Sequence, residues 1–266
     1  VHPRLLEAAV TVSTVLKETP TVVLLGASNL SLGWRPLMQV IFSRWWRPLR
    51  ILTAHGMGRA YLTPSQFGWR TAPGILESDL WSQLAHGNQS SPDAALITDL
   101  GNDLVYGRTA AEVVQAAADA AGRLRNANPD CQIVMTRPPL ASVASLSRLR
   151  YGFFRTVLFP MCRLSLSEIV EATRELDDGI QRLQGVTVVP PQAEWFGLDP
   201  IHVRRRLRKS AFTRILKCWS GDSTGERTTD PVPLARPKMA TRWVMGRQQR
   251  CEQPSVFTAR GSVSAW

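Results

Sequence analysis

Short apolar runs alternate along the chain with longer amphipathic stretches. Five of these runs are bounded by turn signals, and they consist mostly of β-branched, leucyl and alanyl residues. Continuous apolar runs of this kind are typical of strands buried on both faces of a parallel sheet. The predicted strands are Thr21–Leu25, Leu49–Thr53, Ala94–Leu100, Cys131–Met135 and Val186–Val189.

Between these runs, apolar residues recur at the spacing of an amphipathic helix. Leu76, Leu80 and Leu84 fall on one helix face, and Leu207, Ala211 and Ile215 form a similar stripe in the last predicted helix. Other helices are predicted at residues 5–15, 37–45, 109–128 and 165–185, the last two opened by capping-box sequences. Strands alternating with helices predict a three-layer α/β/α sandwich around a five-stranded parallel sheet.

Two regions lack such periodicity. Residues 137–164 are rich in arginine and serine with scattered large apolar side chains, and they are predicted to form a long irregular loop. From residue 219 onward, Ser, Thr, Gly, Pro, Arg and Gln dominate. We therefore predict one folded domain over residues 1–218 and a basic, mostly disordered tail over 219–266.

Charge and cysteine content narrow the class of protein. The net charge is +11 and the pI about 10.5, which raises the possibility of a nucleic-acid or anionic-surface partner. No nucleic-acid-binding motif accompanies this charge, so nucleic acid is disfavoured as a partner. The run from Arg204 to Lys209 is predicted to be a solvated helix face, with an electropositive site rim as the alternative.

The four cysteines form no CxxC pair and have no histidine at ligand spacing. This excludes a typical zinc motif and a disulfide framework, and it favours a reduced, cytoplasmic compartment. The printed sequence begins with Val rather than Met and shows no signal peptide. No apolar run is long enough for a transmembrane helix.

Polar side chains and glycines follow several of the predicted strands. Ser28 comes shortly after the first, Gly58 after the second and Asn102 after the third. Because parallel strands end on one rim of the sheet, these residues can converge. Each also has a structural interpretation, since Ser caps helices and Gly and Asn form turns.

Asp199 and His202 form the most informative pair. At this spacing the carboxylate can accept a hydrogen bond from one imidazole nitrogen and leave the other free to face Ser28. That is the arrangement of a Ser-His-Asp triad, in which the acid orients the base that takes the serine proton. The alternative is that Asp199 only opens a turn and caps the last helix.

These blocks together resemble the SGNH (GDSL-type) hydrolase family over roughly residues 18–218. The matching blocks, in chain order, are Gly26-Ala27-Ser28-Asn29-Leu30, Gly58, Gly101-Asn102-Asp103 and Asp199-Pro200-Ile201-His202. The resemblance implies a flavodoxin-like fold with Ser28 as nucleophile, His202 as general base and acid, and Asp199 orienting it. It also implies an oxyanion hole made of the backbone N–H groups of Ser28 and Gly58 and the side-chain amide of Asn102.

Two positions depart from the family pattern. Ala27 stands where the family has an aspartate, and Leu100 stands where it has a glycine. The α/β-hydrolase elbow fits less well, because Leu30 replaces its last glycine. His55, beside the glycine block, is assigned either a structural role or a substrate contact.

The sequence therefore predicts a serine ester hydrolase that works through an acyl-enzyme without metal or organic cofactor. Its substrate would be a small-molecule or carbohydrate ester, with lipid esters, thioesters and acetylated sugars all open. Two alternatives remain: a catalytically impaired binding module of the same fold, and an Arg-rich binder of nucleic acid or an anionic surface.

Overall fold

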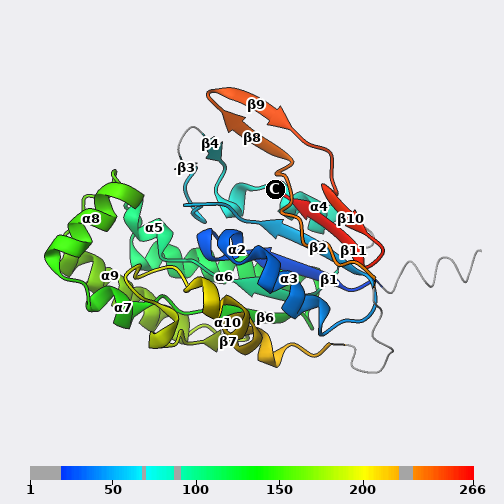
Figure 1. Ribbon diagram of the computed structural model, residues 1–266, viewed down its shortest axis with the longest axis horizontal. Coiled ribbons are helices and arrows are strands. Elements are labelled where there is room, and N and C mark those ends of the chain that lie inside the picture. The colour runs from blue at the N-terminus through cyan, green and yellow to red at the C-terminus, as the bar shows by residue number, and fades with distance from the viewer. Residues whose placement is uncertain (1–18, 68–69, 87–90, 222–229) are drawn as a thin grey trace, which may run out of the picture.

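A seven-stranded sheet runs through the middle of the molecule (Figure 1). The computed structural model describes residues 19–67, 70–86, 91–221 and 230–266; the helix predicted at residues 5–15 lies outside them. The strand order is β10-β11-β2-β1-β5-β6-β7. The bounds are β1 Thr21–Leu25, β2 Leu49–Ala54, β5 Pro92–Ile97, β6 Gln132–Thr136, β7 Thr187–Val189, β10 Val256–Thr258 and β11 Gly261–Ala265.

The five strands predicted from the apolar runs are present and lie side by side as β2-β1-β5-β6-β7, each parallel to its neighbours. β1 is fully buried, and its side chains alternate between two hydrophobic cores. Val22 and Leu24 belong to one core, and Val23 and Leu25 to the other. This double burial explains why the strand reads as an uninterrupted apolar run.

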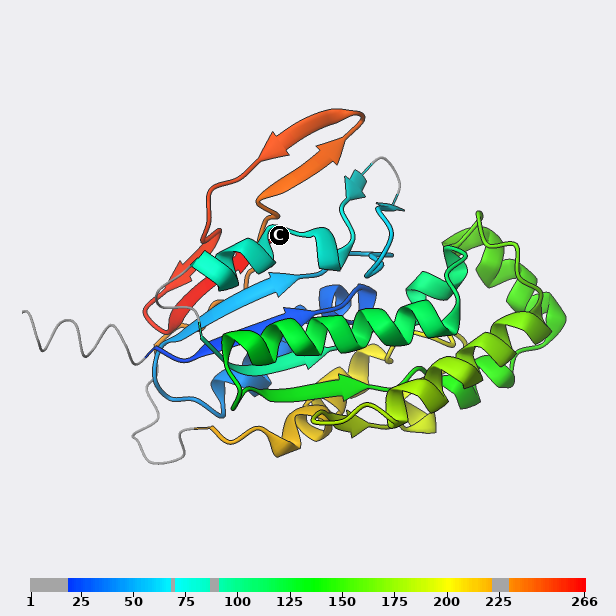
Figure 2. The same cartoon turned by 180° about the vertical axis from the view of Figure 1, so that it is seen from behind.

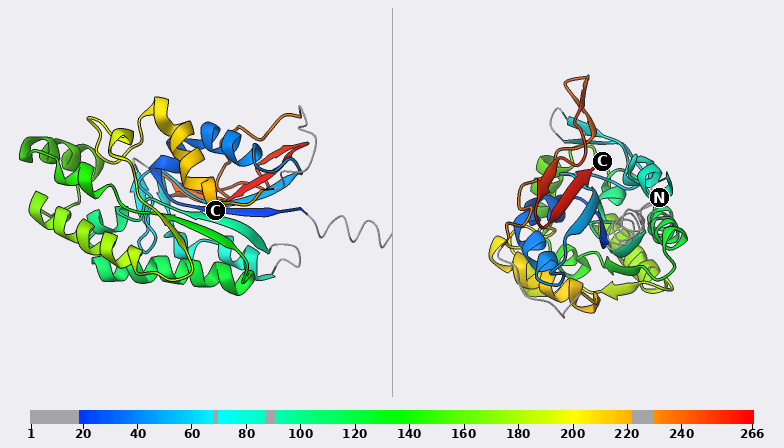
Figure 3. Two further views of the ribbon diagram at one scale, coloured as in Figure 1. Left: turned by 90° about the horizontal axis from the view of Figure 1, so that it is seen from below. Right: turned by 90° about the vertical axis from the view of Figure 1, so that its right-hand side faces the viewer.

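Helices cover both faces of the sheet and make three layers (Figure 3). One face carries α3 (Trp34–Phe42) and α10 (Arg208–Ile215), and the other carries α4 (Leu80–His86), α6 (Ala110–Ala127) and α9 (Leu166–Gln181). Both predicted capping boxes form, at Thr109 with Glu112 and at Ser165 with Glu168. The predicted α/β architecture with a parallel-rich central sheet is confirmed.

The end of the chain differs from the prediction. Residues 230–266, assigned from the sequence to a mostly disordered tail, contribute four strands: β8 (Thr241–Val244), β9 (Arg247–Arg250), β10 and β11. β11 pairs in parallel with β2, and β10 pairs with β11 in the antiparallel direction, so the sheet has seven strands rather than five. The sequence signal is weak because β11 presents only Val263 and Ala265 to the interior as hydrophobic residues, and β9 is fully exposed.

The chain after β2 adds strands that the apolar runs do not indicate: β3 (Ser65–Phe67) and β4 (Arg70–Ala72) join β8 and β9 in a separate four-stranded sheet. The predicted loop is also corrected. Residues 137–164 contain two helices, α7 (Leu140–Ala144) and α8 (Arg148–Leu158), in place of an irregular loop. Figure 2 shows α8 projecting from the end of the molecule toward which the parallel strands point. Its regularity escaped detection because none of its residues is buried.

Candidate active site

The turn that follows β1 places Ser28 at the rim of the sheet. Gly26 continues the strand and bonds to the Ala54 carbonyl, and Ser28 begins the short helix α2 (Ser28–Leu32). A Cβ on Gly26 would lie 2.5 Å from the Thr98 methyl group and 2.9 Å from Leu30, so only glycine allows the strands to approach this closely. Ser28 is 6% exposed, with its hydroxyl turned toward His202.

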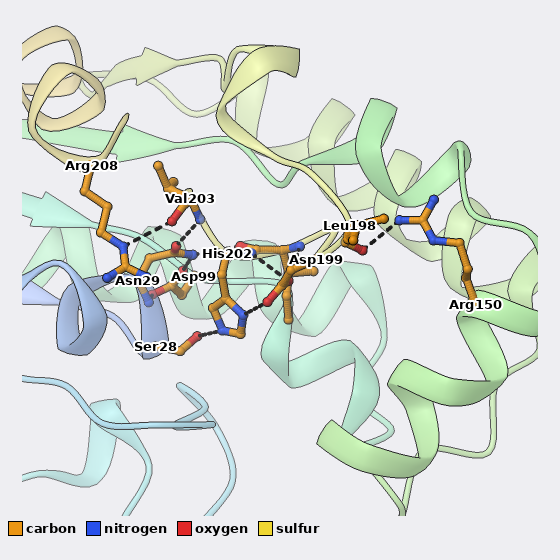
Figure 4. A network of polar contacts seen from close by, with 10 residues as sticks. Ser28, Asn29, Asp99, Arg150, Leu198, Asp199, His202, Val203 and Arg208 are labelled. Carbon is orange, nitrogen blue, oxygen red and sulfur yellow. Dashed lines mark hydrogen bonds and ion pairs between the residues drawn. The ribbon is translucent and has the colours of Figure 1, made fainter. Parts of the chain in front are cut away.

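His202 lies between Ser28 and Asp199 (Figure 4). Its Nε2 is 2.8 Å from the Ser28 Oγ, and its Nδ1 is 2.6 Å from the Asp199 Oδ2. The other carboxylate oxygen of Asp199 accepts the backbone N–H groups of Ile201 and His202, both at 3.1 Å. The Asp-x-x-His spacing thus folds into a turn that fixes the carboxylate and the imidazole together.

The environment of Asp199 favours its ionised form. Burial acts to raise the pKa of this carboxyl, but the hydrogen bond and charge of His202 and the two backbone N–H groups outweigh it, and the pKa is lowered from 3.8. A carboxylate that stays ionised can hold the imidazole in one orientation and stabilise its protonated form.

Asp99 braces the Ser28 turn, and the sequence analysis missed it. Its Oδ2 accepts the backbone N–H groups of Ala27 at 2.8 Å and Asn29 at 3.1 Å, and its Oδ1 accepts the Asn29 side-chain amide at 2.7 Å. The residue has φ 61°, in the left-handed region that aspartate tolerates better than most residues. A carboxylate therefore supports this turn although position 27 is alanine.

Asn29 links the Ser28 turn to the loop that carries His202. Its side-chain nitrogen donates to the Ile201 carbonyl at 2.9 Å, and its side-chain oxygen accepts the Val203 backbone N–H at 2.9 Å. These two hydrogen bonds hold Ile201 and Val203, the residues on either side of His202. The sequence shows only that Asp99 closely follows the third apolar run and that Asn29 follows Ser28, and nothing in the pattern pairs these two residues.

The predicted oxyanion-hole residues are partly assembled. Asn102 is buried and lines the same cavity as Ser28, with its side-chain nitrogen donating to the Arg59 carbonyl at 2.9 Å. Gly58 has φ 66° and does not line that cavity; its carbonyl accepts the Tyr106 hydroxyl at 2.8 Å. Within the described part of the chain, no acceptor binds the backbone N–H of either Ser28 or Gly58.

Buried polar groups hold the Gly58 loop against the strand ends. Asp103, which is inaccessible to solvent, accepts the backbone N–H groups of Tyr61 at 2.8 Å and Leu62 at 2.9 Å. The Tyr61 hydroxyl lies within hydrogen-bonding distance of the carbonyls of Leu25 and Thr98, at the ends of β1 and β5. Tyr61 therefore ties this loop to the base of the Ser28 turn.

His55 has a structural environment. Its ring stacks on Trp34 with centroids 5.0 Å apart, and its Nδ1 lies 2.9 Å from the Thr53 hydroxyl. Burial, reinforced by the positive charges of Arg59 and Arg236, lowers its pKa to about 3, so the imidazole is neutral near pH 7. These contacts favour the structural role over the substrate contact.

An apolar cavity of about 130 Å³ opens beside Ser28. It extends under the ends of β5 and β6 toward α9 and α10. Leu100, the bulky residue in the asparagine block, forms part of its wall, and Asn102 lines the same cavity. Other apolar lining residues are Val105, Val143, Phe159, Ile169, Trp195, Phe196, Ile201, Phe212 and Ile215.

The basic run after His202 divides into two parts. Arg204, Arg205 and Arg206 are exposed, as the solvated-face prediction required. Arg208 instead donates to the carbonyls of Leu32 at 2.7 Å and Val203 at 3.1 Å, which joins α2 to the His202 loop. Burial, followed by the charges of neighbouring arginines, lowers its pKa.

The sequence also led to predictions about disulfides, metal ions and membrane spans. The four cysteines are unpaired there, and no group of three His, Cys, Asp or Glu side chains in that part is placed to hold a metal ion. None of the helices described is both long and apolar enough to cross a bilayer.

Comparison with known proteins gives only distant similarity. No protein-family model matches the chain, and no curated protein does. Among solved structures, the chain is similar to a protein named as a GDSL-like lipase from Parabacteroides merdae, with 12% identity, 76% of this chain and 95% of that chain covered, and a TM-score of 0.43.

Two further structures show comparable similarity. A carbohydrate esterase of family 3 from Talaromyces cellulolyticus is 14% identical over 74% of this chain and 94% of that chain, with a TM-score of 0.45. The periplasmic domain of a lipopolysaccharide acetyltransferase from Salmonella ser. Paratyphi A is 12% identical over 80% and 88%, with a TM-score of 0.44.

Proposed function

We propose that this chain is a serine ester hydrolase that acts through an acyl-enzyme. The observation that carries the proposal is the alignment of three side chains at the rim of the sheet. The Ser28 hydroxyl faces one imidazole nitrogen of His202 at 2.8 Å, and Asp199 holds the other at 2.6 Å. A serine activated in this way attacks acyl carbonyl groups.

The proposed reaction has two stages. The Ser28 Oγ bonds to the ester carbonyl carbon while its proton passes to His202 Nε2, and the tetrahedral intermediate then collapses as that proton moves to the departing alcohol. Water next attacks the acyl-enzyme, gives its proton to His202, and releases the carboxylic acid as Ser28 regains a proton. Asp199 orients the imidazole and stays ionised throughout.

The developing oxyanion needs preorganised donors. We assign this role to the backbone N–H groups of Ser28 and Gly58 and to the second amide hydrogen of Asn102, since the first is held by the Arg59 carbonyl. The two backbone groups have no acceptor among the described residues, which leaves them available. Removal of one such donor typically lowers turnover by about 10²–10³.

The cavity beside Ser28 favours an ester with an apolar acyl group that fits about 130 Å³. Its wall is formed mainly by aliphatic and aromatic side chains. A short or medium acyl chain would bury apolar surface there, whereas a sugar on the acyl side would leave hydroxyl groups without partners. An acetylated sugar remains compatible, because the sugar is the alcohol that departs and only the acetyl group would occupy the cavity.

Hydrolysis of 4-nitrophenyl acetate by the purified chain tests the proposal. Ser28→Ala and His202→Ala should each lower kcat by at least about 10³. Ser31→Ala is the matched control, because Ser31 lies one turn further along α2 and its hydroxyl donates to the Ala27 carbonyl. A fluorophosphonate should add once, to Ser28, as peptide mass spectrometry would report.

The outcomes separate the alternatives. Turnover that survives both substitutions would refute the mechanism. A folded protein with neither turnover nor an adduct on Ser28 would favour the catalytically impaired binding module. Salt-sensitive DNA binding without esterase activity would favour the nucleic-acid binder.

A further inference from the structure

Helix α8 has an apolar face that nothing in the described structure covers. Leu149, Phe153 and Val157 follow one another at four-residue steps, so they share one side of the helix. Their exposed fractions are 89%, 63% and 59%. Met161, just after the helix, is 78% exposed, and Leu198, on the adjoining loop, is 83% exposed. We call these five side chains the α8 surface.

Such a face is unusual for a helix held in place by the fold. No residue of α8 is buried, although an amphipathic helix normally turns its apolar side toward the core. The opposite side of the segment is anchored: the Tyr151 hydroxyl donates to the Leu164 carbonyl at 2.6 Å, and Phe159 packs edge-on against Tyr106. The fold therefore holds the α8 surface toward solvent, and its exposure does not result from a loosely attached segment.

The surroundings of the α8 surface are basic. Arg148, Arg150, Arg155 and Arg163 lie on or next to the helix, and residues 131–167 contain no Asp or Glu. Two acidic residues adjoin the segment: Glu168, which acts electrostatically on Tyr151, and Asp199, next to Leu198. The chain as a whole carries a net charge of +11, so a second copy would approach against like charge. Charge complementarity selects an anionic partner.

The shape of the α8 surface indicates which anionic partner fits. Figures 1 and 2 show α8 projecting from one end of the molecule, and its apolar side chains Leu149, Phe153 and Val157 are mostly exposed. Apolar side chains on one face of a helix flanked by arginines are typical of helices that lie in the headgroup region of a membrane. Arginines near an anionic leaflet add favourable electrostatic energy.

We propose that the α8 surface docks this protein on an anionic lipid bilayer. In this orientation the apolar side chains enter the boundary between headgroups and acyl chains while the arginines meet lipid phosphates. The candidate active site is linked to α8, because Arg150 donates to the Leu198 carbonyl at 2.7 Å, one residue before Asp199. Phe159 and Val143, from the same segment, line the cavity beside Ser28. The docking does not depend on Ser28 being a nucleophile.

Vesicle co-sedimentation of the full chain tests the proposal. Vesicles of phosphatidylcholine alone are compared with vesicles that also contain phosphatidylglycerol. The protein should bind the anionic vesicles, and added salt should weaken the binding. Combined Leu149→Ser, Phe153→Ser and Val157→Ser should lower the partition coefficient by at least about tenfold. Each arginine contributes about fivefold near an anionic surface, so Arg148→Gln with Arg155→Gln should cost about 25-fold.

Matched controls come from strands β9 and β10 rather than from α8. Phe257, in β10, is 78% exposed, so Phe257→Ser removes a comparable apolar side chain. Arg247→Gln with Arg250→Gln removes two exposed arginines of β9. Both controls should bind vesicles as the unaltered chain does. Circular dichroism and thermal unfolding show whether each variant is folded.

Three results would overturn the proposal. The first is a folded protein that does not bind anionic vesicles. The second is a Leu149→Ser, Phe153→Ser, Val157→Ser triple variant that binds anionic vesicles as well as the unaltered chain and the Phe257→Ser control do. The third is a dimer in sedimentation analysis that the triple variant converts to monomer without any vesicle binding, because the α8 surface would then contact a second copy.

Discussion

Asp99→Asn tests whether the Ser28 turn depends on a carboxylate from another strand. Asparagine has nearly the same shape and also tolerates the left-handed backbone, so the φ of 61° at this position adds little strain to the substitution. What changes is the side chain's capacity to accept. The carboxylate accepts three N–H donors, from the Ala27 backbone and from the backbone and side chain of Asn29.

The expected loss in the free energy of unfolding follows from those three hydrogen bonds. If the new amide turns its oxygen toward the two backbone N–H groups, its nitrogen meets the side-chain nitrogen of Asn29, donor against donor. Asn29 cannot turn over in response without losing its bonds to Ile201 and Val203. One charge-assisted bond is lost and two become neutral, which should lower the free energy of unfolding by about 2–4 kcal/mol.

Chemical denaturation and turnover measure the two consequences separately. The denaturation midpoint should fall at an unchanged slope. Under native conditions kcat for 4-nitrophenyl acetate should fall by about 10–100-fold, because Ser28 and His202 are positioned through this network and reacting groups tolerate little displacement. Asp93→Asn is the matched control: Asp93 lies near the start of β5 and, among the described residues, accepts one N–H, that of the Thr21 backbone at 2.7 Å.

In Asp93→Asn the hydrogen bond from the Thr21 backbone can persist, because the asparagine side-chain oxygen still accepts one N–H. Asp93→Asn should cost less than about 1 kcal/mol and leave kcat unchanged. The reasoning about Asp99 is refuted if its asparagine variant is as stable as the unaltered chain, or if both variants lower kcat equally.

Three further outcomes are expected. Tyr61→Phe should lower the free energy of unfolding by about 1 kcal/mol in denaturant titration, because the carbonyls of Leu25 and Thr98 lose a hydroxyl donor. Asn102→Ala should lower kcat by about 10²–10³ with little change in KM, since the amide would act on the oxyanion rather than on the bound ester. The pKa of Asp199 is lowered in the folded state, so its contribution to stability is complete above pH 3.8 and is lost as the pH falls through the lower folded value. Unfolding curves of Asp199→Asn and the unaltered chain should therefore converge in acid.

The central fold could be predicted because its strands are buried on both faces. β1 is apolar at every position but Thr21, and each of the other four predicted strands also appears as a short apolar run. β11 could not be predicted in this way. In β11, Ser alternates with small apolar residues, and the strand is held in the sheet by backbone pairing with β2. A single sequence does not reveal such pairing.

The site residues also differ in whether the sequence alone could identify them. Asp199 and His202 are near in sequence, and Ser28 follows a clear strand, so local patterns could suggest them. Asp99 and Asn29 are 70 residues apart, and their hydrogen bonds exist only because β1 and β5 are neighbours in the sheet. Their identity as a pair requires the register of two strands, which no local pattern contains.

The segment from Asp99 to Asp103, which ends in the first turn of helix α5 (Asn102–Val105), joins the parts of the site that local patterns suggest separately. At its start Asp99 holds the turn after β1, and at its end Asp103 accepts two backbone N–H groups from the loop after β2. Between them, Asn102 bonds to the Arg59 carbonyl. Because β5 lies next to β1, and β1 next to β2, one five-residue segment can reach both turns. The asparagine proposed to touch the oxyanion is therefore fixed by the same backbone that fixes the serine turn, so a displacement of this segment should impair nucleophile and oxyanion donors together.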